Sequence, residues 1–182
     1  MADPSVTGVL LVGGASRRFG SPKALARLGG ETLAERTWRV LGEAFPVRIA
    51  VGKTADGLQL PFPVVDDGSE VRASLAGLVG GLRAAETEVV VFLPVDCPLM
   101  DAAGLRSLAA ACRDAAVSET DPLPAAYRRR ALPVLERRLA ARELRLRDAL
   151  AELDVARVAL DPALLANVNE PADLERLEAD RP

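Results

Sequence analysis

The chain has 182 residues, enough for one domain built around a single hydrophobic core. A net charge of −3 and the lack of any long apolar run argue against general binding to nucleic acid or a membrane, so we expect a cytoplasmic protein. The sequence has no histidine, which excludes a Ser-His-Asp triad, a histidine general base and any zinc site that needs histidine. Without a histidine to activate it, Cys97 is predicted to be a buried, reduced thiol.

Strand-like and helix-like segments alternate along the chain, which predicts a single-domain α/β fold with a doubly wound, mostly parallel sheet of the Rossmann-like type. Strands are expected at residues 6–12, 47–51, 64–65, 88–94, 115–118 and about 155–160. Helices are expected at residues 32–42, 74–85, 101–113, 131–141 and 146–153, with a last helix starting at Pro171. The small residues of the 74–85 helix suit close packing on a sheet through Gly77, Gly80 and Gly81.

The loop after the first strand, within LVGGASRRFGSPKAL at residues 11–25, carries a pair of adjacent glycines and three cationic side chains. Gly13 and Gly14 allow a sharp turn whose main-chain N–H groups can converge on an anion. Arg17, Arg18 and Lys23 add positive charge nearby. The spacing fits neither a P-loop nor a G-x-G-x-x-G dinucleotide fingerprint. The loop therefore predicts a phosphate site of another kind, the alternative being an ordinary strand-to-helix turn with solvated arginines.

A carboxylate follows the strongest predicted strand, at Asp96, between Pro94 and Pro98. Two prolines favour a stiff turn that aims this side chain, although an aspartate there can also be a simple turn former. Asp66 and Asp67 follow the short third strand and add carboxylates at the same edge. Because Mg²⁺ needs few protein ligands when substrate phosphates complete its shell, these elements predict a nucleoside triphosphate site.

Arginine is dense between Arg128 and Arg147, where few acidic residues balance it. Helical spacing makes a solvated face the default interpretation. The alternative is a surface that attracts a phosphorylated substrate.

The loop at residues 11–25, with SLAGLVGGL (74–82), VDCPL (95–99) and NVNEPADL (167–174), resembles the nucleotidyltransferases that use a GG-x-S-x-R-x-G…K loop. The resemblance covers nearly the whole chain and is closest to the molybdenum cofactor guanylyltransferases. It implies a nucleotidyltransferase fold and the Mg²⁺-dependent transfer of GMP from GTP to the phosphate of molybdopterin, with release of pyrophosphate. Molybdoenzyme maturation proteins are the further partners it implies.

The resemblance also implies roles for particular residues. Residues 1–100 would bind the nucleotide and residues 101–182 the pterin. On the nucleotide side the matching residues are Leu11, Val12, Gly13, Gly14, Arg18, Lys23 and Asp66, with Lys23 on the phosphates and Arg18 as the motif arginine. Asp96 matches the magnesium ligand, whereas Asn167 and Asn169 match a motif associated with the pterin.

Some positions depart from the family pattern and keep alternatives open. Gly52, followed by Lys53, stands where some members have a nucleotide-contacting asparagine, and the Ser-Pro-Lys form of the loop also occurs in cytidylyltransferase-like enzymes. The alternatives are a molybdenum cofactor cytidylyltransferase, a sugar-phosphate nucleotidyltransferase or a non-catalytic nucleotide-binding module.

Overall fold

The computed structural model describes residues 5–13, 19 and 22–179. Its main sheet has seven strands in the order β5-β4-β1-β6-β8-β7-β9. These strands are β1 (Val6–Leu11), β4 (Val47–Gly52), β5 (Val64–Asp66), β6 (Val89–Pro94), β7 (Ala115–Ser118), β8 (Ala125–Arg128) and β9 (Val155–Val158). The helices are α1 (Leu33–Ala44), α2 (Ser74–Ala84), α3 (Ala102–Ala111), α4 (Leu132–Ala140), α5 (Leu146–Leu150) and α6 (Pro171–Ala179). The predicted α/β class and mostly parallel sheet are confirmed.

The sheet is parallel from β5 through β4 and β1 to β6, and again between β7 and β9. β8 lies between these groups and runs antiparallel to both β6 and β7. β8 was not predicted from the sequence, and neither was the small hairpin formed by β2 (Arg27–Leu28) and β3 (Glu31–Thr32). Since β6 pairs with β8, both halves of the chain contribute to one sheet.

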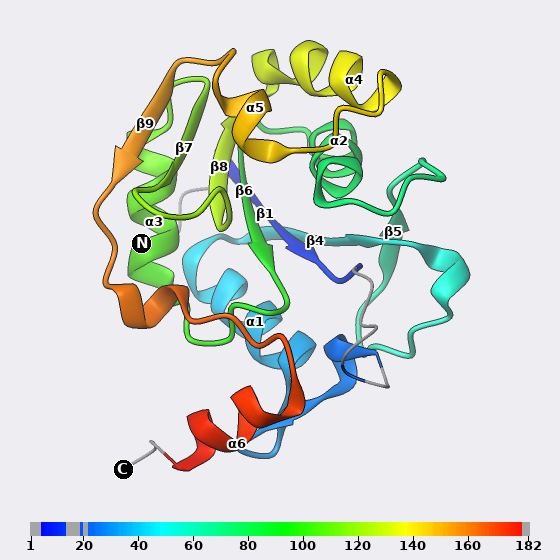
Figure 1. Cartoon of the computed structure of the whole chain (residues 1–182), viewed down its shortest axis with the longest axis vertical. Coiled ribbons are helices and arrows are strands. Elements are labelled where there is room, and N and C mark those ends of the chain that lie inside the picture. Colours follow the sequence, from blue (N-terminus) through cyan, green and yellow to red (C-terminus); the bar gives the residue numbers. More distant parts are fainter. Residues whose placement is uncertain (1–4, 14–18, 20–21, 180–182) are drawn as a thin grey trace.

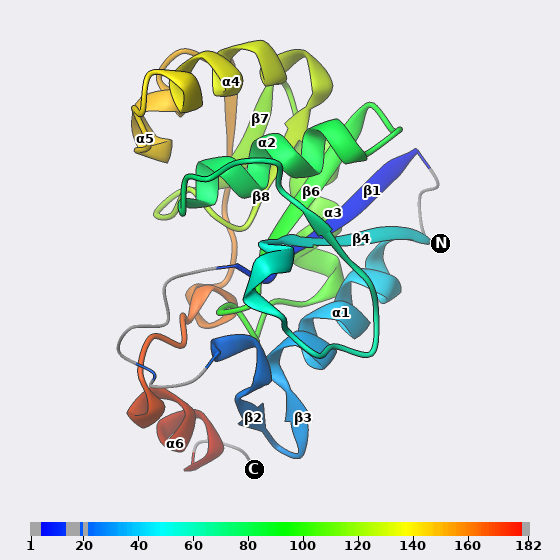
Figure 2. The ribbon, with the colours of Figure 1, turned by 90° about the vertical axis from the view of Figure 1, so that its right-hand side faces the viewer.

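Helices cover both faces of the sheet, as Figure 2 shows. α1 packs beside α3 on one face, and α2 packs beside α4 on the other. Alternate residues of the central strands point to opposite faces, so Leu10 joins the core under α1 and α3, whereas Val9 and Phe92 join the core under α2 and α4. The result is a three-layer arrangement with two hydrophobic cores separated by the sheet (Figure 1).

Local signals explain where α1 begins and how closely α2 approaches the sheet. Thr32 and Glu35 form a capping box at the start of α1, with mutual hydrogen bonds of 3.1 and 2.9 Å. In α2, a Cβ atom added at Gly77 would lie 2.8 Å from Leu11 Cδ2, and one added at Gly80 would lie 2.7 Å from Asp67 Cα. These contacts confirm the predicted close packing and bring α2 against the ends of β1 and β5.

Among the described residues, no helix combines the length and apolar character needed to cross a membrane.

Candidate functional site

The site lies where the strand order of the sheet changes direction. From β1 the chain passes to β4 and β5 on one side, then returns through α2 to β6 on the other side of β1. Parallel sheets bind ligands outside the carboxyl ends of their strands at such a switch point. β1 ends at Leu11 and β6 ends at Pro94, and Val95 N–H donates a 3.1 Å hydrogen bond to the carbonyl oxygen of Leu11. This bond holds the two carboxyl ends together.

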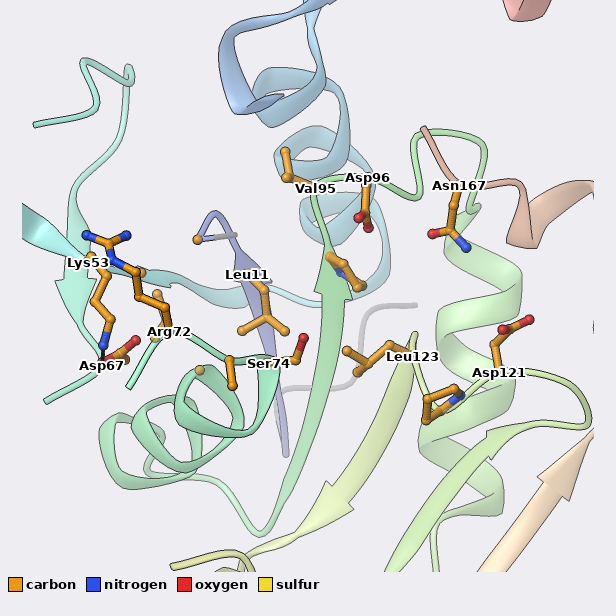
Figure 3. Close-up of a pocket in the computed structure, with 17 residues that line it drawn as sticks. Leu11, Lys53, Asp67, Arg72, Ser74, Val95, Asp96, Asp121, Leu123 and Asn167 are labelled. Atoms are coloured by element: carbon orange, nitrogen blue, oxygen red, sulfur yellow. Dashed lines mark hydrogen bonds and ion pairs between the residues drawn. The ribbon is translucent and has the colours of Figure 1, made fainter. Parts of the chain in front are cut away.

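A pocket of about 390 Å³ opens at these carboxyl ends. Its described lining comes from the ends of β1, β4 and β6, the start of α2, the 119–124 loop and the segment before α6. Figure 3 shows these residues around the pocket. They are Leu11, Gly13, Val51, Gly52, Lys53, Asp67, Arg72, Ala73, Ser74, Gly77, Pro94, Val95, Asp96, Asp121, Pro122, Leu123 and Asn167.

Lys23 and Asn169, which are not among the described lining residues, meet Asp96 at one end of the pocket, although the three come from distant parts of the chain. Lys23 Nζ lies 3.2 Å from Asp96 Oδ2 and 3.3 Å from Asn169 Oδ1. The Lys23 side chain is 15% exposed and the Asp96 side chain 29%, so both groups are partly shielded from water yet remain accessible. Three of the predicted site residues thus form one hydrogen-bonded group.

The turn that carries Asp96 is fixed by its backbone. Val168 N–H donates a 2.8 Å hydrogen bond to the Asp96 carbonyl oxygen, and the Val168 side chain is fully buried. Arg36 Nε donates to the carbonyl oxygen of Pro98 at 2.8 Å, at the far side of the same turn. The Asn167–Asn169 segment is therefore held against Asp96, and it contains both asparagines of the chain.

The Cys97 thiol takes part in this contact. Its Sγ donates to Asn167 Oδ1 at 3.2 Å, and Asn167 itself lines the pocket. Burial raises the pKa of the Cys97 thiol well above its usual value, and the nearby Asp96 carboxylate raises it further. Both cysteines are free and buried, so the prediction of a buried, reduced Cys97 is confirmed.

At the other end of the pocket, Lys53 and Asp67 form a second ion pair. Lys53 Nζ lies 2.6 Å from Asp67 Oδ1 and also donates to the carbonyl oxygen of Ser69. The two side chains are only 11% and 6% exposed. Arg72, which also lines the pocket, forms a bidentate ion pair with Asp56 at 2.6 and 3.1 Å.

Asp66, which the resemblance matched to the nucleotide, points elsewhere. Its carboxylate accepts hydrogen bonds from the Thr54 hydroxyl at 2.7 Å, from Thr54 N–H at 2.9 Å and from Gly68 N–H at 2.9 Å. These bonds, with the Thr54 hydroxyl making the largest contribution, lower the Asp66 pKa to about 2. The described pocket lining includes Asp67 and not Asp66. Of the two adjacent aspartates, Asp67 is therefore the one that lines the pocket.

The other predicted residues are placed as follows. Leu11 and Gly13 line the pocket, while the Val12 side chain is buried in the core and its N–H donates to the Val51 carbonyl oxygen at 3.0 Å. Gly14 and Arg18 lie outside the described residues.

Several side chains of the arginine-rich segment at residues 128–147 form ion pairs and hydrogen bonds within the protein. Arg138 is nearly buried and its guanidinium lies 2.6 Å from Glu152, with Glu143 and Asp148 nearby. Arg130 pairs with Asp114, and Arg147 donates to the Thr120 carbonyl oxygen at 2.7 Å. None of the described lining residues comes from this segment. These contacts account for several of its arginines without a phosphorylated substrate.

Asp121, Pro122 and Leu123 form one wall of the pocket, and this wall was not predicted from the sequence. Ser118 Oγ accepts from Asp121 N–H at 2.8 Å and donates to the Asp121 carbonyl oxygen at 3.1 Å. The turn-rich composition of residues 119–124 is a signal for a loop, but only the pairing of β8 with β6 brings that loop to the pocket.

Comparison with known proteins identifies the class to which this fold and site belong. A family model described as the MobA-like NTP transferase domain matches residues 8–158, and the chain belongs to this family. It is therefore a nucleotidyltransferase, as the sequence analysis predicted.

The chain is similar over nearly its full length to more narrowly named proteins. A probable molybdenum cofactor guanylyltransferase of Opitutus terrae is 36% identical, with 94% of each chain covered. A protein of the same name from Bacillus licheniformis is 32% identical, with 93% of this chain and 95% of the relative covered. The crystal structure of molybdopterin-guanine dinucleotide biosynthesis protein A from Archaeoglobus fulgidus has a TM-score of 0.80 at 27% identity and covers 95% of this chain and 97% of that protein.

Proposed function

We propose that this protein is a molybdenum cofactor guanylyltransferase that transfers GMP from GTP to the terminal phosphate of molybdopterin and releases pyrophosphate. The names of its full-length relatives support this activity. The observation that carries the proposal is the contact of Lys23 with both Asp96 and Asn169 at the switch point of the sheet. A cation for phosphates, a carboxylate for a metal and an amide for a second substrate meet there.

The residues at this end fit a magnesium ion. Asp96 offers a partly exposed carboxylate at the pocket, and Asn167 beside it offers an amide group. The described residues contain no group of three or more metal-ligating side chains. Such a sparse donor set suits Mg²⁺, which keeps waters and substrate phosphates as ligands, better than an ion that needs a protein cage. Bound Mg²⁺ would neutralise phosphate charge and orient the triphosphate.

The proposed reaction needs no protein nucleophile. The acceptor phosphate is already anionic near neutral pH, and one of its oxygens attacks the α-phosphorus of GTP. A new P–O bond forms as the α–β bridging bond breaks, and pyrophosphate leaves with the electron pair. The task of the protein is to hold both reactants in line and to neutralise the developing charge.

The chain's own groups divide this work. The Lys23 ammonium neutralises charge on the departing pyrophosphate, and the main-chain N–H of Gly13 donates to the triphosphate. Asn169 lies just before α6, where its N–H donates to Asp173 Oδ2 at 2.7 Å, and so presents its side chain at a fixed place. The acceptor would bind on that side, next to Asp121 and Asn167.

The test is direct transfer. Purified protein is incubated with Mg²⁺, molybdopterin and GTP labelled at the α-phosphate, and both the labelled dinucleotide and pyrophosphate are measured. CTP and a sugar phosphate acceptor are tested in parallel. Formation of molybdopterin guanine dinucleotide supports the proposal. Transfer from CTP alone, transfer only to the sugar phosphate, or binding without transfer would contradict it and favour one of the alternatives.

A further inference from the structure

The chain contains only two lysines, and every other cationic side chain is an arginine. Both lysines form ion pairs with aspartates that line the same pocket: Lys23 with Asp96 and Lys53 with Asp67. Lys23 has a role in the proposed transfer, whereas Lys53 has none so far. Lysine differs from arginine in presenting a compact ammonium with three N–H donors, which fits a narrow site where a guanidinium would not.

Among the residues that the structure describes, one N–H of the Lys53 ammonium has no hydrogen-bond partner. Two of its N–H groups are accounted for by Asp67 Oδ1 at 2.6 Å and by the carbonyl oxygen of Ser69. In the part of the chain that the structure describes, the two hydrogen bonds to the Asp67 carboxylate come from Lys53 and Ser69 N–H, and both end at Oδ1. The third ammonium N–H and Asp67 Oδ2 thus form a donor beside an acceptor.

This pair lies away from the proposed reaction centre but within the same pocket. Figure 3 shows Lys53 and Asp67 on the opposite side of Leu11 from Asp96 and Asn167. Between the two ends, Gly13 and Gly52 form part of the lining. A Cβ atom at Gly52 would lie 2.8 Å from Val12 Cγ2, so the close approach of these strand ends requires a glycine there. If the phosphates of a nucleotide bind at Lys23 and Asp96, the rest of the nucleotide extends along the pocket toward Lys53.

We propose that Lys53, together with Asp67, determines which nucleotide base the site accepts. The pair selects a base that has a ring carbonyl beside a ring N–H. It rejects a base that has an exocyclic amino group beside an unprotonated ring nitrogen. This inference rests on the proposed function and concerns the same site. Guanine presents O6 as an acceptor and N1–H as a donor, which match the ammonium and the carboxylate. Adenine and cytosine present an amino donor and a ring-nitrogen acceptor in these places.

The mismatch has a physical cost. With adenine or cytosine, the amino group faces the third ammonium N–H and the ring nitrogen faces Asp67 Oδ2, so this donor and this acceptor are left without partners. A site built to hydrogen-bond one pattern strongly rejects the reversed pattern, because its polar groups are then left unpaired. The low exposure of both side chains limits replacement of those partners by water. The pair therefore favours GTP and ITP over CTP and ATP.

The experiment measures nucleotide binding in the presence of Mg²⁺ and the absence of acceptor, by competition of GTP, ITP, CTP and ATP against a fluorescent GTP analogue. The wild-type protein should bind GTP and ITP more tightly than CTP and ATP. Lys53→Met should lower the GTP-to-CTP affinity ratio by about tenfold or more, the value of a hydrogen bond to a charged group. Because Lys53→Met leaves Asp67 shielded and unpaired, the double variant Lys53→Met with Asp67→Asn provides a second test in which both charges are removed.

The other lysine supplies the matched control. Lys23→Met should weaken all four nucleotides by a similar factor and keep their ratios, since phosphates are common to them. An unchanged GTP-to-CTP ratio in the folded Lys53 single and double variants would overturn the inference, as would a wild-type preference for CTP or ATP. These outcomes are separate from the proposed function: a protein that selects GTP but makes no dinucleotide would contradict the transfer and leave the role of Lys53 standing.

Discussion

The Lys23 ammonium lies 3.2 Å from the Asp96 carboxylate, although 73 positions separate the two residues along the chain. This ion pair links the loop after β1 to the turn after β6. It holds the cation proposed to bind phosphate and the proposed metal ligand together in the structure without substrate.

Replacing either member of this pair should abolish most of the transfer. Asp96→Asn and Lys23→Met are each expected to lower kcat by about 100-fold or more, because each removes charge stabilisation at the reacting phosphates. Labelled-GTP transfer measures the loss, and circular dichroism checks that the variants fold. Near-normal turnover by either folded variant would remove that residue from the mechanism.

Asn169→Ala should affect the acceptor more than the nucleotide. Asn169 meets the reaction centre from the C-terminal segment, through its 3.3 Å contact with Lys23. We expect an increase in KM for molybdopterin of about tenfold, as for a lost hydrogen bond to a charged group, with little change in GTP binding. Steady-state kinetics with each substrate varied in turn gives the two values. The exposed neighbour Glu170, replaced by alanine, serves as the control, and a larger effect on GTP than on molybdopterin would contradict the prediction.

Asp66 should contribute to stability in a pH-dependent way. Its folded-state pKa is lowered to about 2 by the hydrogen bonds from Thr54 and Gly68. Because the folded-state pKa is lowered, the contribution of Asp66 to the free energy of unfolding is fully present above about pH 4, near the pKa of an unfolded aspartate. It is lost as the pH falls toward 2. Thermal melts of the wild type and Asp66→Asn should therefore differ at pH 6 and converge near pH 2. A constant difference across this range would show that ionised Asp66 is not the cause.

The two cysteines should resist thiol reagents in the folded protein. Burial raises the pKa of the Cys112 thiol to about 11 and that of Cys97 further. A raised pKa leaves little of the reactive thiolate at pH 8. Titration with a chromogenic disulfide should label neither thiol at that pH until denaturant is added, when both react. Rapid labelling of one thiol in the folded protein, identified by comparison with Cys97→Ala, would contradict its placement.

The sequence predicted those elements whose signal is local. β6 is an apolar run that begins with three valines, and α1 has both helical spacing and a capping pair, so each was placed to within a few residues. β8 was missed because it has only four residues, two of them alanine, and follows a turn-rich stretch. It is a strand because β6 and β7 supply partners on both of its edges, and that pairing is not visible in the local sequence.

At the site, too, the local sequence does not determine which of two adjacent residues lines the pocket. Asp66 is the last residue of β5 and Asp67 follows it directly, and successive side chains of a strand point in opposite directions. Which of them meets the pocket depends on how β5 sits against β4 and α2, and the sequence alone does not determine this. Lys53 is a related case: its position after β4 was noted, but its pairing with Asp67 depends on the fold of the intervening loop.

The C-terminal helix gives the reaction centre a second support. α6 packs against the β2 strand, and Gly29 N–H of the β2–β3 hairpin donates a 3.2 Å hydrogen bond to Glu178 of α6. Lys23 lies a few residues before that hairpin and Asn169 lies directly before α6. The contact between α6 and the hairpin therefore holds together the two segments that carry Lys23 and Asn169. Truncating the chain after residue 170 would remove α6 and so weaken the positioning of Lys23. It would do so although none of the described lining residues of the pocket belongs to α6.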